Sequence, residues 1–264
     1  MSRLLRFLKN LFWKSSNTSY YVIEYRYCGY PHKYFRSIYN YFQRRFRMTH
    51  PNYHYVPHIT LLAPIESNNE KLLIELMKPV LSKYHHKIHE IGNLVESGDL
   101  IKFNTKEKQV LAVDIVKRDI LEDIRTELEN TFKKQEGISF TGYKERLWHT
   151  TIWNDKTGKS KIKFKKVWQS AKQYRIKELN FIIDRITLIK NGKILKEFDL
   201  VNDKVLSRKA SLNGNARYNS YLSIRALLKE KGEIPYQKTR SNIVSEEDMD
   251  WKDMDGTIQS EWDN

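Results

Sequence analysis

Two short stretches of the chain carry the same pair of reactive side chains, a histidine and a threonine two residues apart in an apolar run. The first stretch is PHITL at residues 57–61, and the second is WHTTI at residues 148–152. Both are rich in residues that favour β-strands. Because alternate side chains of a strand point to the same face, the histidine and the threonine of each stretch project together. If the two strands lie side by side, two imidazoles and two hydroxyls converge at one place.

The four converging side chains would be His58, Thr60, His149 and Thr151, and their chemistry suits attack on a phosphodiester. Histidine has an ordinary pKa of about 6.5 and can act as a base or as an acid near neutral pH. One imidazole would take a proton from water, and the other would give a proton to the leaving oxygen. The threonine hydroxyls would hold the non-bridging oxygens, where negative charge develops. The similarity of the two motifs leaves open which histidine is the base.

This mechanism needs no metal ion or other cofactor, and none is expected. The chain has a single cysteine, which excludes an internal disulfide and a zinc site built from several cysteines. No convincing set of carboxylates and histidines stands at metal-ligand spacing.

The same order of elements is expected before each motif. A strand over 22–27 and a helix over 32–47 precede the first motif, and a strand over 111–116 and a helix over 119–134 precede the second. This is an internal duplication in pattern, although not in residue identity. A duplicated unit explains how two similar motifs could meet across a pseudo-twofold axis.

The two motifs resemble those of the 2H phosphoesterase superfamily, the 2′-5′ RNA ligase-like and 2′,3′-cyclic-nucleotide phosphodiesterase group. PHITLLAPI at residues 57–65 is close to the first motif of that family, and LWHTTIW at residues 147–153 fits the second less closely. The family usually has a hydrophobic residue where this chain has Thr150, whose side chain should face away from the site. The resemblance covers roughly residues 18–202.

The resemblance implies an α+β fold with two pseudo-symmetric lobes. Each lobe would be a mainly antiparallel sheet backed by helices, and the catalytic cleft would lie between the lobes. It also implies an enzyme that acts on RNA or nucleotides. Such enzymes open a 2′,3′-cyclic phosphate to a 2′-phosphate, or cleave or join 2′-5′ bonds in RNA. Some relatives act on cyclic or 2′-5′-linked oligonucleotide signals.

Four residues near the second motif are candidates for contacts to a phosphate or a base. Tyr143, Lys144 and Arg146 stand just before His149, where they form either a substrate-binding loop or simply a basic loop. Trp153 has the same parity as His149, so it could stack on a nucleobase at the edge of the site. A tryptophan of the core is an equally good interpretation of Trp153.

Composition points to a polyanionic partner. The formal net charge is +15 and the isoelectric point is about 9.6, which suits RNA above all, or an anionic membrane surface. The single cysteine fits a reducing compartment. No run of 18 apolar residues is present, and the N-terminus lacks the core of a secretion signal. We therefore expect a cytoplasmic protein. We also expect a monomer, although no sequence feature reports the oligomeric state.

The chain divides into four expected segments. Residues 1–17 hold an amphipathic basic helix, whose apolar face over 3–14 either docks on the domain or makes weak contact with a membrane surface. Residues 18–202 form the two-lobed domain, and residues 203–244 a basic, partly helical extension that either adds to an RNA-binding surface or is a solvated appendage. Residues 245–264 carry eight acidic side chains and one lysine, which is typical of a disordered tail.

Other elements follow from periodicity and turn residues. They are helices over 70–83, 164–173 and 216–231, a hairpin over 91–104 turning at 97–99, one long strand over 176–189, a type I′ turn at Asn191-Gly192 and a returning strand over 193–200.

Two other classes of protein remain open from the sequence. A non-catalytic RNA-binding protein would keep the basic surface without needing both histidines, each of which would then be a structural residue in its strand. A membrane-surface adaptor would depend on residues 3–14 instead. Substitution of His58 or His149 should abolish turnover and largely spare RNA affinity only if the chain is an enzyme.

Overall fold

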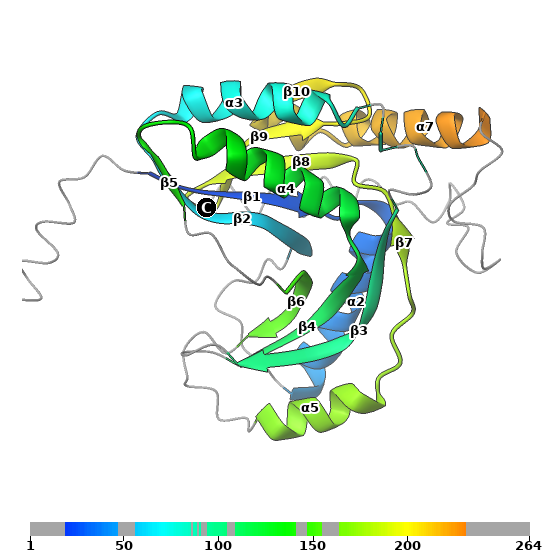
Figure 1. Ribbon diagram of the computed structural model, residues 1–264. Coiled ribbons are helices and arrows are strands. Elements are labelled where there is room, and N and C mark those ends of the chain that lie inside the picture. Colours follow the sequence, from blue (N-terminus) through cyan, green and yellow to red (C-terminus); the bar gives the residue numbers. More distant parts are fainter. Residues whose placement is uncertain are drawn as a thin grey trace, which may run out of the picture.

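The computed structural model describes residues 19–46, 56–85, 87–88, 90, 94–104, 109–140, 147–154 and 164–230. These residues fold into an α+β structure with one large sheet and helices packed on it (Figure 1). The predicted fold class, a mainly antiparallel sheet backed by helices, is confirmed. The predicted N-terminal helix within 1–17 and the acidic tail at 245–264 lie outside the described residues.

The sheet is antiparallel in each of its described pairings, in the order β10-β9-β8-β1-β2-β6-β4-β3-β7, with β5 added beside β2. The strands are β1 (Ser19–Arg26), β2 (His58–Ser67), β3 (Val95–Asn104), β4 (Gln109–Lys117), β5 (Ile138–Phe140), β6 (His149–Asn154), β7 (Asn180–Phe181), β8 (Arg185–Lys190), β9 (Lys193–Asp199) and β10 (Lys204–Ser207).

The sheet consists of two halves that meet at the strands of the two motifs. One half runs from β10 to β2 and the other from β6 to β7, and the ladder between β2 and β6 is reduced to the pair Ile59 and Thr150. The sheet turns sharply at this junction in Figure 1. The short ladder lets the two halves diverge while the motif strands stay side by side.

Two helices each pack on the half of the sheet that does not contain the strand before them. The helices are α2 (Gly29–Phe46), α3 (Glu70–Ser82), α4 (Asp119–Phe132), α5 (Phe164–Gln173), α6 (Arg208–Ser211) and α7 (Gly214–Glu230). Helix α2 follows β1 but packs on β6, whereas α4 follows β4 but packs on β2 beside α3. Figure 1 shows α3 and α4 over the β1–β2 half and α2 over the β4–β6 half. Each half of the duplicated unit therefore supplies a helix that covers the other half.

Apolar spacing explains why α3 and α4 form where the sequence predicts them. Helix α3 begins after Asn69, whose side chain accepts a hydrogen bond from the Leu72 amide at 3.0 Å. Its buried residues Leu73, Met77, Val80 and Leu81 follow helical spacing. Helix α4 buries Ile120, Leu121, Ile124, Leu128 and Phe132 in the same way.

The predicted hairpin over 91–104 is wrong, because residues 95–104 form the single strand β3. Ser97-Gly98-Asp99 is a bulge in the pairing with β4 rather than a turn. A Cβ atom on Gly98 would lie 2.6 Å from Cγ1 of Val116, so the glycine is there for close approach of the strands. The Ser97 hydroxyl accepts a hydrogen bond from the Leu179 amide at 3.0 Å, which fixes the bulge against the chain before β7.

The predicted long strand over 176–189 is also wrong, because the segment crosses from one half of the sheet to the other. Its first part, β7, pairs with β3, and its second part, β8, pairs with β1. Residues 181–189 are all buried, so this part of the run lacks the alternation that would have marked the break at 182–184. The turn after β8 is as predicted, with φ of 49° at Asn191 and 81° at Gly192.

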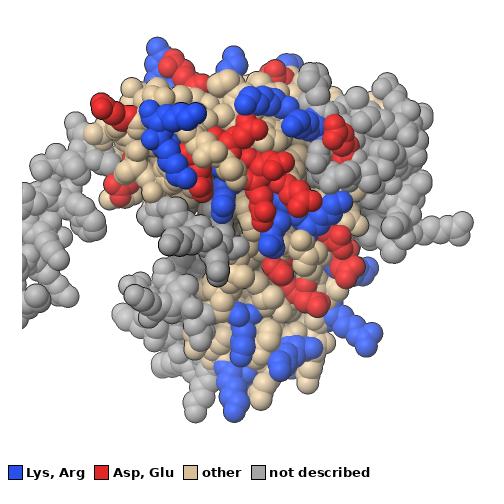
Figure 2. Space-filling view, in the orientation of Figure 1, with Lys and Arg blue, Asp and Glu red and all other residues tan. Residues whose placement is uncertain are grey.

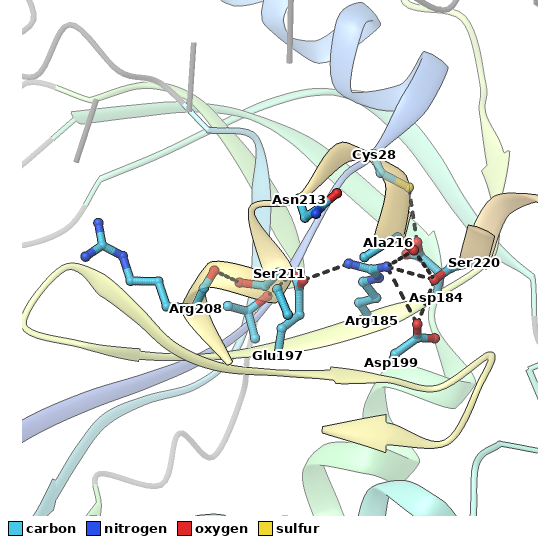
Figure 3. A network of polar contacts seen from close by, with 12 residues as sticks. Cys28, Asp184, Arg185, Glu197, Asp199, Arg208, Ser211, Asn213, Ala216 and Ser220 are labelled. Atoms are coloured by element: carbon cyan, nitrogen blue, oxygen red, sulfur yellow. Dashed lines mark hydrogen bonds and ion pairs between the residues drawn. The ribbon is translucent and has the colours of Figure 1, made fainter. Parts of the chain in front are cut away.

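The described part of the basic extension packs on the sheet. Strand β10 pairs with β9, and the helix predicted near 216–231 is confirmed as α7. Arg185 of β8 links β9 to α7: Nη1 donates to the Glu197 carboxylate at 2.9 Å and Nη2 to the Ala216 carbonyl at 2.8 Å (Figure 3). Nη2 also donates to the hydroxyl of Ser220, which is fully buried. None of the helices in the described residues is long and apolar enough to span a membrane.

Candidate active site

The two motif strands lie next to each other, and the register places their reactive residues on one face. Strands β2 and β6 are antiparallel with Ile59 opposite Thr150. Pairing about this point sets His58 beside Thr151 and Thr60 beside His149. Ile59 and Thr150 are fully buried on the other face, whereas the four reactive side chains are partly exposed. The register therefore places the two motifs on neighbouring strands, with their reactive residues at positions of the same face.

Both histidines are held in the same way. Nδ1 of His58 lies 2.8 Å from the Val56 carbonyl oxygen, and Nδ1 of His149 lies 2.7 Å from the Leu147 carbonyl oxygen. A carbonyl oxygen can only accept, so each Nδ1 must carry the proton. Each ring therefore presents Nε2 as the nitrogen that can take or give a proton.

The unusual middle residue of the second motif has a partner on the buried face. The Thr150 hydroxyl lies 2.6 Å from the Tyr27 hydroxyl, and both side chains are buried. Burial raises the pKa of Tyr27, although the hydrogen bond to Thr150 opposes this, so the phenol stays protonated. A threonine can therefore replace the expected hydrophobic residue because its hydroxyl is satisfied.

A buried ion pair on β1, which was not predicted from the sequence, adjoins the first histidine. Across β1 and β2, Arg26 pairs with His58 and Glu24 with Thr60. Glu24 accepts a hydrogen bond from Arg26 Nε at 2.5 Å on Oε1, and its Oε2 lies 3.9 Å from His58 Nε2. Two charged residues at alternate positions of an otherwise apolar strand were the available signal.

The Glu24 carboxyl is ionised in this setting. Burial alone would raise the pKa of Glu24, but the charges of His58 and Arg26 and the hydrogen bond from Arg26 bring it below the ordinary value. Only 6% of Glu24 is exposed, so its charge is poorly screened by water. The site thus contains a buried ion pair of Glu24 and Arg26 beside one histidine.

The second histidine has different neighbours. Asp114 of β4 lies opposite His149, and Asp114 Oδ1 accepts a hydrogen bond from the Ile115 amide at 2.9 Å. The ring of Phe103 meets that of His149 edge-on, with centroids 4.8 Å apart and planes at 67°. The described neighbours of the two histidines therefore differ.

Of the four predicted substrate contacts, Trp153 is the one that lies within the described residues. Tyr143, Lys144 and Arg146 lie outside the described residues. Trp153 is 5% exposed and stacks on Phe164 of α5, with centroids 5.2 Å apart and planes at 11°. A register shift in the β4–β6 ladder next to Trp153 breaks the alternation that the parity argument assumed. The structure supports the interpretation of Trp153 as a core residue.

Within the described ranges, no three His, Cys, Asp or Glu side chains are grouped so that they could hold a metal ion.

Comparison with known proteins gives distant structural likeness only. No family model matches the chain, and no curated protein matches it. Two solved structures of Usb1 from Kluyveromyces marxianus are similar, one of them with uridine monophosphate. Their sequences are 12% and 13% identical to this chain, and their TM-scores are 0.40 and 0.43. Each match covers 70% of this chain and 99% of the Usb1 chain. Likeness at this level carries no argument for function, which therefore rests on the residues of the site.

Proposed function

We propose that the chain is a phosphodiesterase of RNA or nucleotides that uses His58 and His149 as general acid and base, without a metal ion. The observation that carries this proposal is the pairing of β2 and β6 at Ile59 and Thr150, which brings both His-x-Thr motifs onto one face. The matched Nδ1 hydrogen bonds support it, because they aim both reactive nitrogens from equivalent positions.

The reaction is in-line displacement at phosphorus. One neutral imidazole takes a proton from water as its oxygen attacks, and the other, an imidazolium, gives a proton to the ribose oxygen that leaves. Thr60 and Thr151 donate hydrogen bonds to the non-bridging oxygens, where charge builds up. The substrate is a 2′,3′-cyclic phosphate, opened to a 2′-phosphate, or a 2′-5′ phosphodiester. Joining of 2′-5′ ends and degradation of cyclic oligonucleotide signals use the same geometry.

The surface around α5 supports RNA over a small nucleotide. Its sequence, FKKVWQSAKQ, contains no acidic residue. The ammonium nitrogens of Lys102 and Lys172 lie 5.2 and 5.9 Å from ring centroids of Trp168. The part of Figure 2 that corresponds to α5 shows blue side chains and no red ones. Basic and aromatic groups together bind single-stranded nucleic acid.

The reaction class is tested on an RNA oligonucleotide and on a dinucleotide, each ending in a 2′,3′-cyclic phosphate, in the presence of EDTA. We expect opening to a single phosphate isomer in EDTA. We also expect a higher kcat/KM for the oligonucleotide, with an advantage that shrinks as salt is raised, because phosphate contacts are salt-sensitive. Binding of RNA without turnover of these or of 2′-5′-linked substrates would favour the non-catalytic alternative.

A further inference from the structure

Four apolar residues of β3 and β4 continue the face of the sheet that carries Thr151 of the second motif. They are Ile101, Phe103, Val110 and Ala112. Ala112 lies opposite Thr151, so these two side chains share a face. Ile101 lies opposite Ala112 on the next strand. Two positions further along both strands, Phe103 lies opposite Val110. The sheet therefore presents an apolar surface beside the second motif, on its reactive face.

These four residues lie outside the contiguous hydrophobic core. Among the described residues, the core cluster includes none of them. The residues that β4 gives to that cluster alternate with them along the strand and are Leu111, Val113 and Ile115. Val110 and Ala112 are buried, whereas Ile101 and Phe103 are partly exposed. The two residues of β3 are therefore the part of this surface that a ligand can reach, and accessible apolar side chains beside reactive groups are typical of ligand sites.

The ring of Phe103 adjoins the imidazole of His149. Their centroids are 4.8 Å apart and their planes meet at 67°, so the rings touch at an edge and do not stack. Such a contact occupies at most one face of the phenyl ring. Because Phe103 is also partly exposed, its ring can stack on a flat group of a ligand. That group would lie next to the imidazole, within the span of one nucleotide.

The opposite side of the site is charged. Across β1 and β2, Arg26 lies opposite His58 and Glu24 opposite Thr60, and the two charged residues form an ion pair. The strand order places this pair on one side of the motif strands and β3 on the other. A nucleobase gains from stacking on an aromatic ring, and an ion pair offers it no flat apolar partner. The site therefore gives a nucleotide one favourable orientation, with its base toward β3.

We propose that Phe103 stacks on the base of the nucleotide whose phosphate is attacked, with Ile101 beside it completing the apolar surface. This inference rests on the proposed function and adds a base subsite on the His149 side of the site. Phe103 takes the role that the sequence suggested for Trp153, which is buried. Stacking tolerates any base, so the subsite favours a base over no base and does not select one base over another.

The first test measures kcat and KM of wild type, Phe103→Leu and Phe103→Tyr on an RNA oligonucleotide that ends in a 2′,3′-cyclic phosphate. A matched oligonucleotide has the same terminal ribose and cyclic phosphate but lacks the terminal base. Phe103→Leu keeps an apolar side chain without an aromatic ring, so it should raise KM for the complete substrate about tenfold and change kcat little. For the baseless substrate the rise should disappear, because the lost contact is with the base. Phe103→Tyr keeps the ring and should restore KM to within about twofold of wild type.

Tyr20→Leu is the matched control, because it removes a ring that is 45% exposed from the far end of β1. It should leave KM for both substrates as in wild type. Equal rises in KM for both substrates in Phe103→Leu would overturn the proposal, since Phe103 would then act only as a support for His149. An unchanged KM for the complete substrate in that variant would overturn it as well.

A binding measurement separates failure of this inference from failure of the proposed function. Calorimetric titration with adenosine 2′-monophosphate and with ribose 2-phosphate needs no turnover. Phe103→Leu should weaken binding of the adenosine compound about tenfold and binding of ribose 2-phosphate much less. Equal affinity of wild type and folded Phe103→Leu for adenosine 2′-monophosphate would refute the base subsite even if the enzyme is active. Selective weakening in a protein that turns over no phosphodiester would refute the proposed function alone.

Discussion

The hydroxyls of Tyr27 and Thr150 lie 2.6 Å apart on the buried face of the sheet. Thr150 stands between His149 and Thr151, whose side chains belong to the opposite face. Tyr27 follows β1, so this contact ties the first half of the chain to the motif strand of the second. It also contributes to the junction between the two halves, where the β2–β6 ladder is short.

This contact predicts coupled effects on stability. Tyr27→Phe and Thr150→Val should each destabilise the fold by about 1–3 kcal/mol, because each leaves a buried hydroxyl without its partner. The double variant should recover part of the summed loss, since neither hydroxyl then remains. Urea unfolding of the four proteins measures the coupling. Strictly additive losses would show that the hydroxyl pair contributes nothing.

Arg185, Glu197 and Asp199 form a buried ion network, which predicts a larger loss of stability. Arg185→Met should lower the free energy of unfolding by about 3–5 kcal/mol, because Glu197 and Asp199 stay buried without their cation. Lys204→Met, at an exposed site on the neighbouring β10, is the matched control and should change it by less than about 0.5 kcal/mol. Equal effects of the two substitutions in urea would contradict a structural role for the network.

The same network predicts a pH dependence of stability through Asp184. Burial raises the pKa of Asp184 above its ordinary value of 3.8, against the attraction of Arg185 and the hydrogen bond from Cys28. The folded protein thus binds this proton more tightly than the unfolded chain does. Its contribution to stability is complete below the ordinary pKa and is lost as the pH rises through the raised one.

Asp184→Asn removes this titration and should therefore gain stability relative to wild type as the pH rises. Unfolding free energies of both proteins at several pH values between about 3 and 8 measure the difference. A difference that moves in the opposite direction would mean that the carboxyl is more acidic in the folded protein.

The motif threonines should act on the transition state rather than on substrate binding. Thr60→Val and Thr151→Val should each lower kcat by about a hundredfold while changing KM little, because the lost hydrogen bond strengthens only as charge develops on phosphate oxygens. Thr150→Val, on the opposite face, is the control and should leave kcat close to that of wild type. A rise in KM with unchanged kcat would assign the hydroxyls to ground-state binding.

The sequence predicted those parts of the fold in which local pattern decides. The apolar spacing of α3 and α4 and the Asn191-Gly192 turn were predicted because each follows from neighbouring residues. The bulge at Gly98 and the break after Phe181 were missed, because both depend on partners far along the chain, Val116 and the strands β3 and β1. Pairing between strands that are far apart in the sequence leaves little sign in the local sequence pattern.

The features of the candidate site divide in the same way, into those set by local pattern and those set by distant strand pairing. The His-x-Thr motifs were visible because alternation within a strand fixes which residues share a face. Their juxtaposition at Ile59 and Thr150 was only a hypothesis until the strand order was known. Glu24 and Arg26 were not predicted, because only the register of β1 with β2 places them beside Thr60 and His58. The sequence left Trp153 open between the site and the core, because the register shift in the β4–β6 ladder cannot be read from spacing.

The most direct test of the site is turnover of an RNA oligonucleotide that ends in a 2′,3′-cyclic phosphate by wild type, His58→Ala and His149→Ala, with RNA binding measured on the same proteins. We predict that each substitution lowers turnover by at least about a hundredfold, as expected for loss of a general acid or base, and leaves RNA affinity nearly unchanged. Turnover that survives in either variant would contradict the two-histidine mechanism.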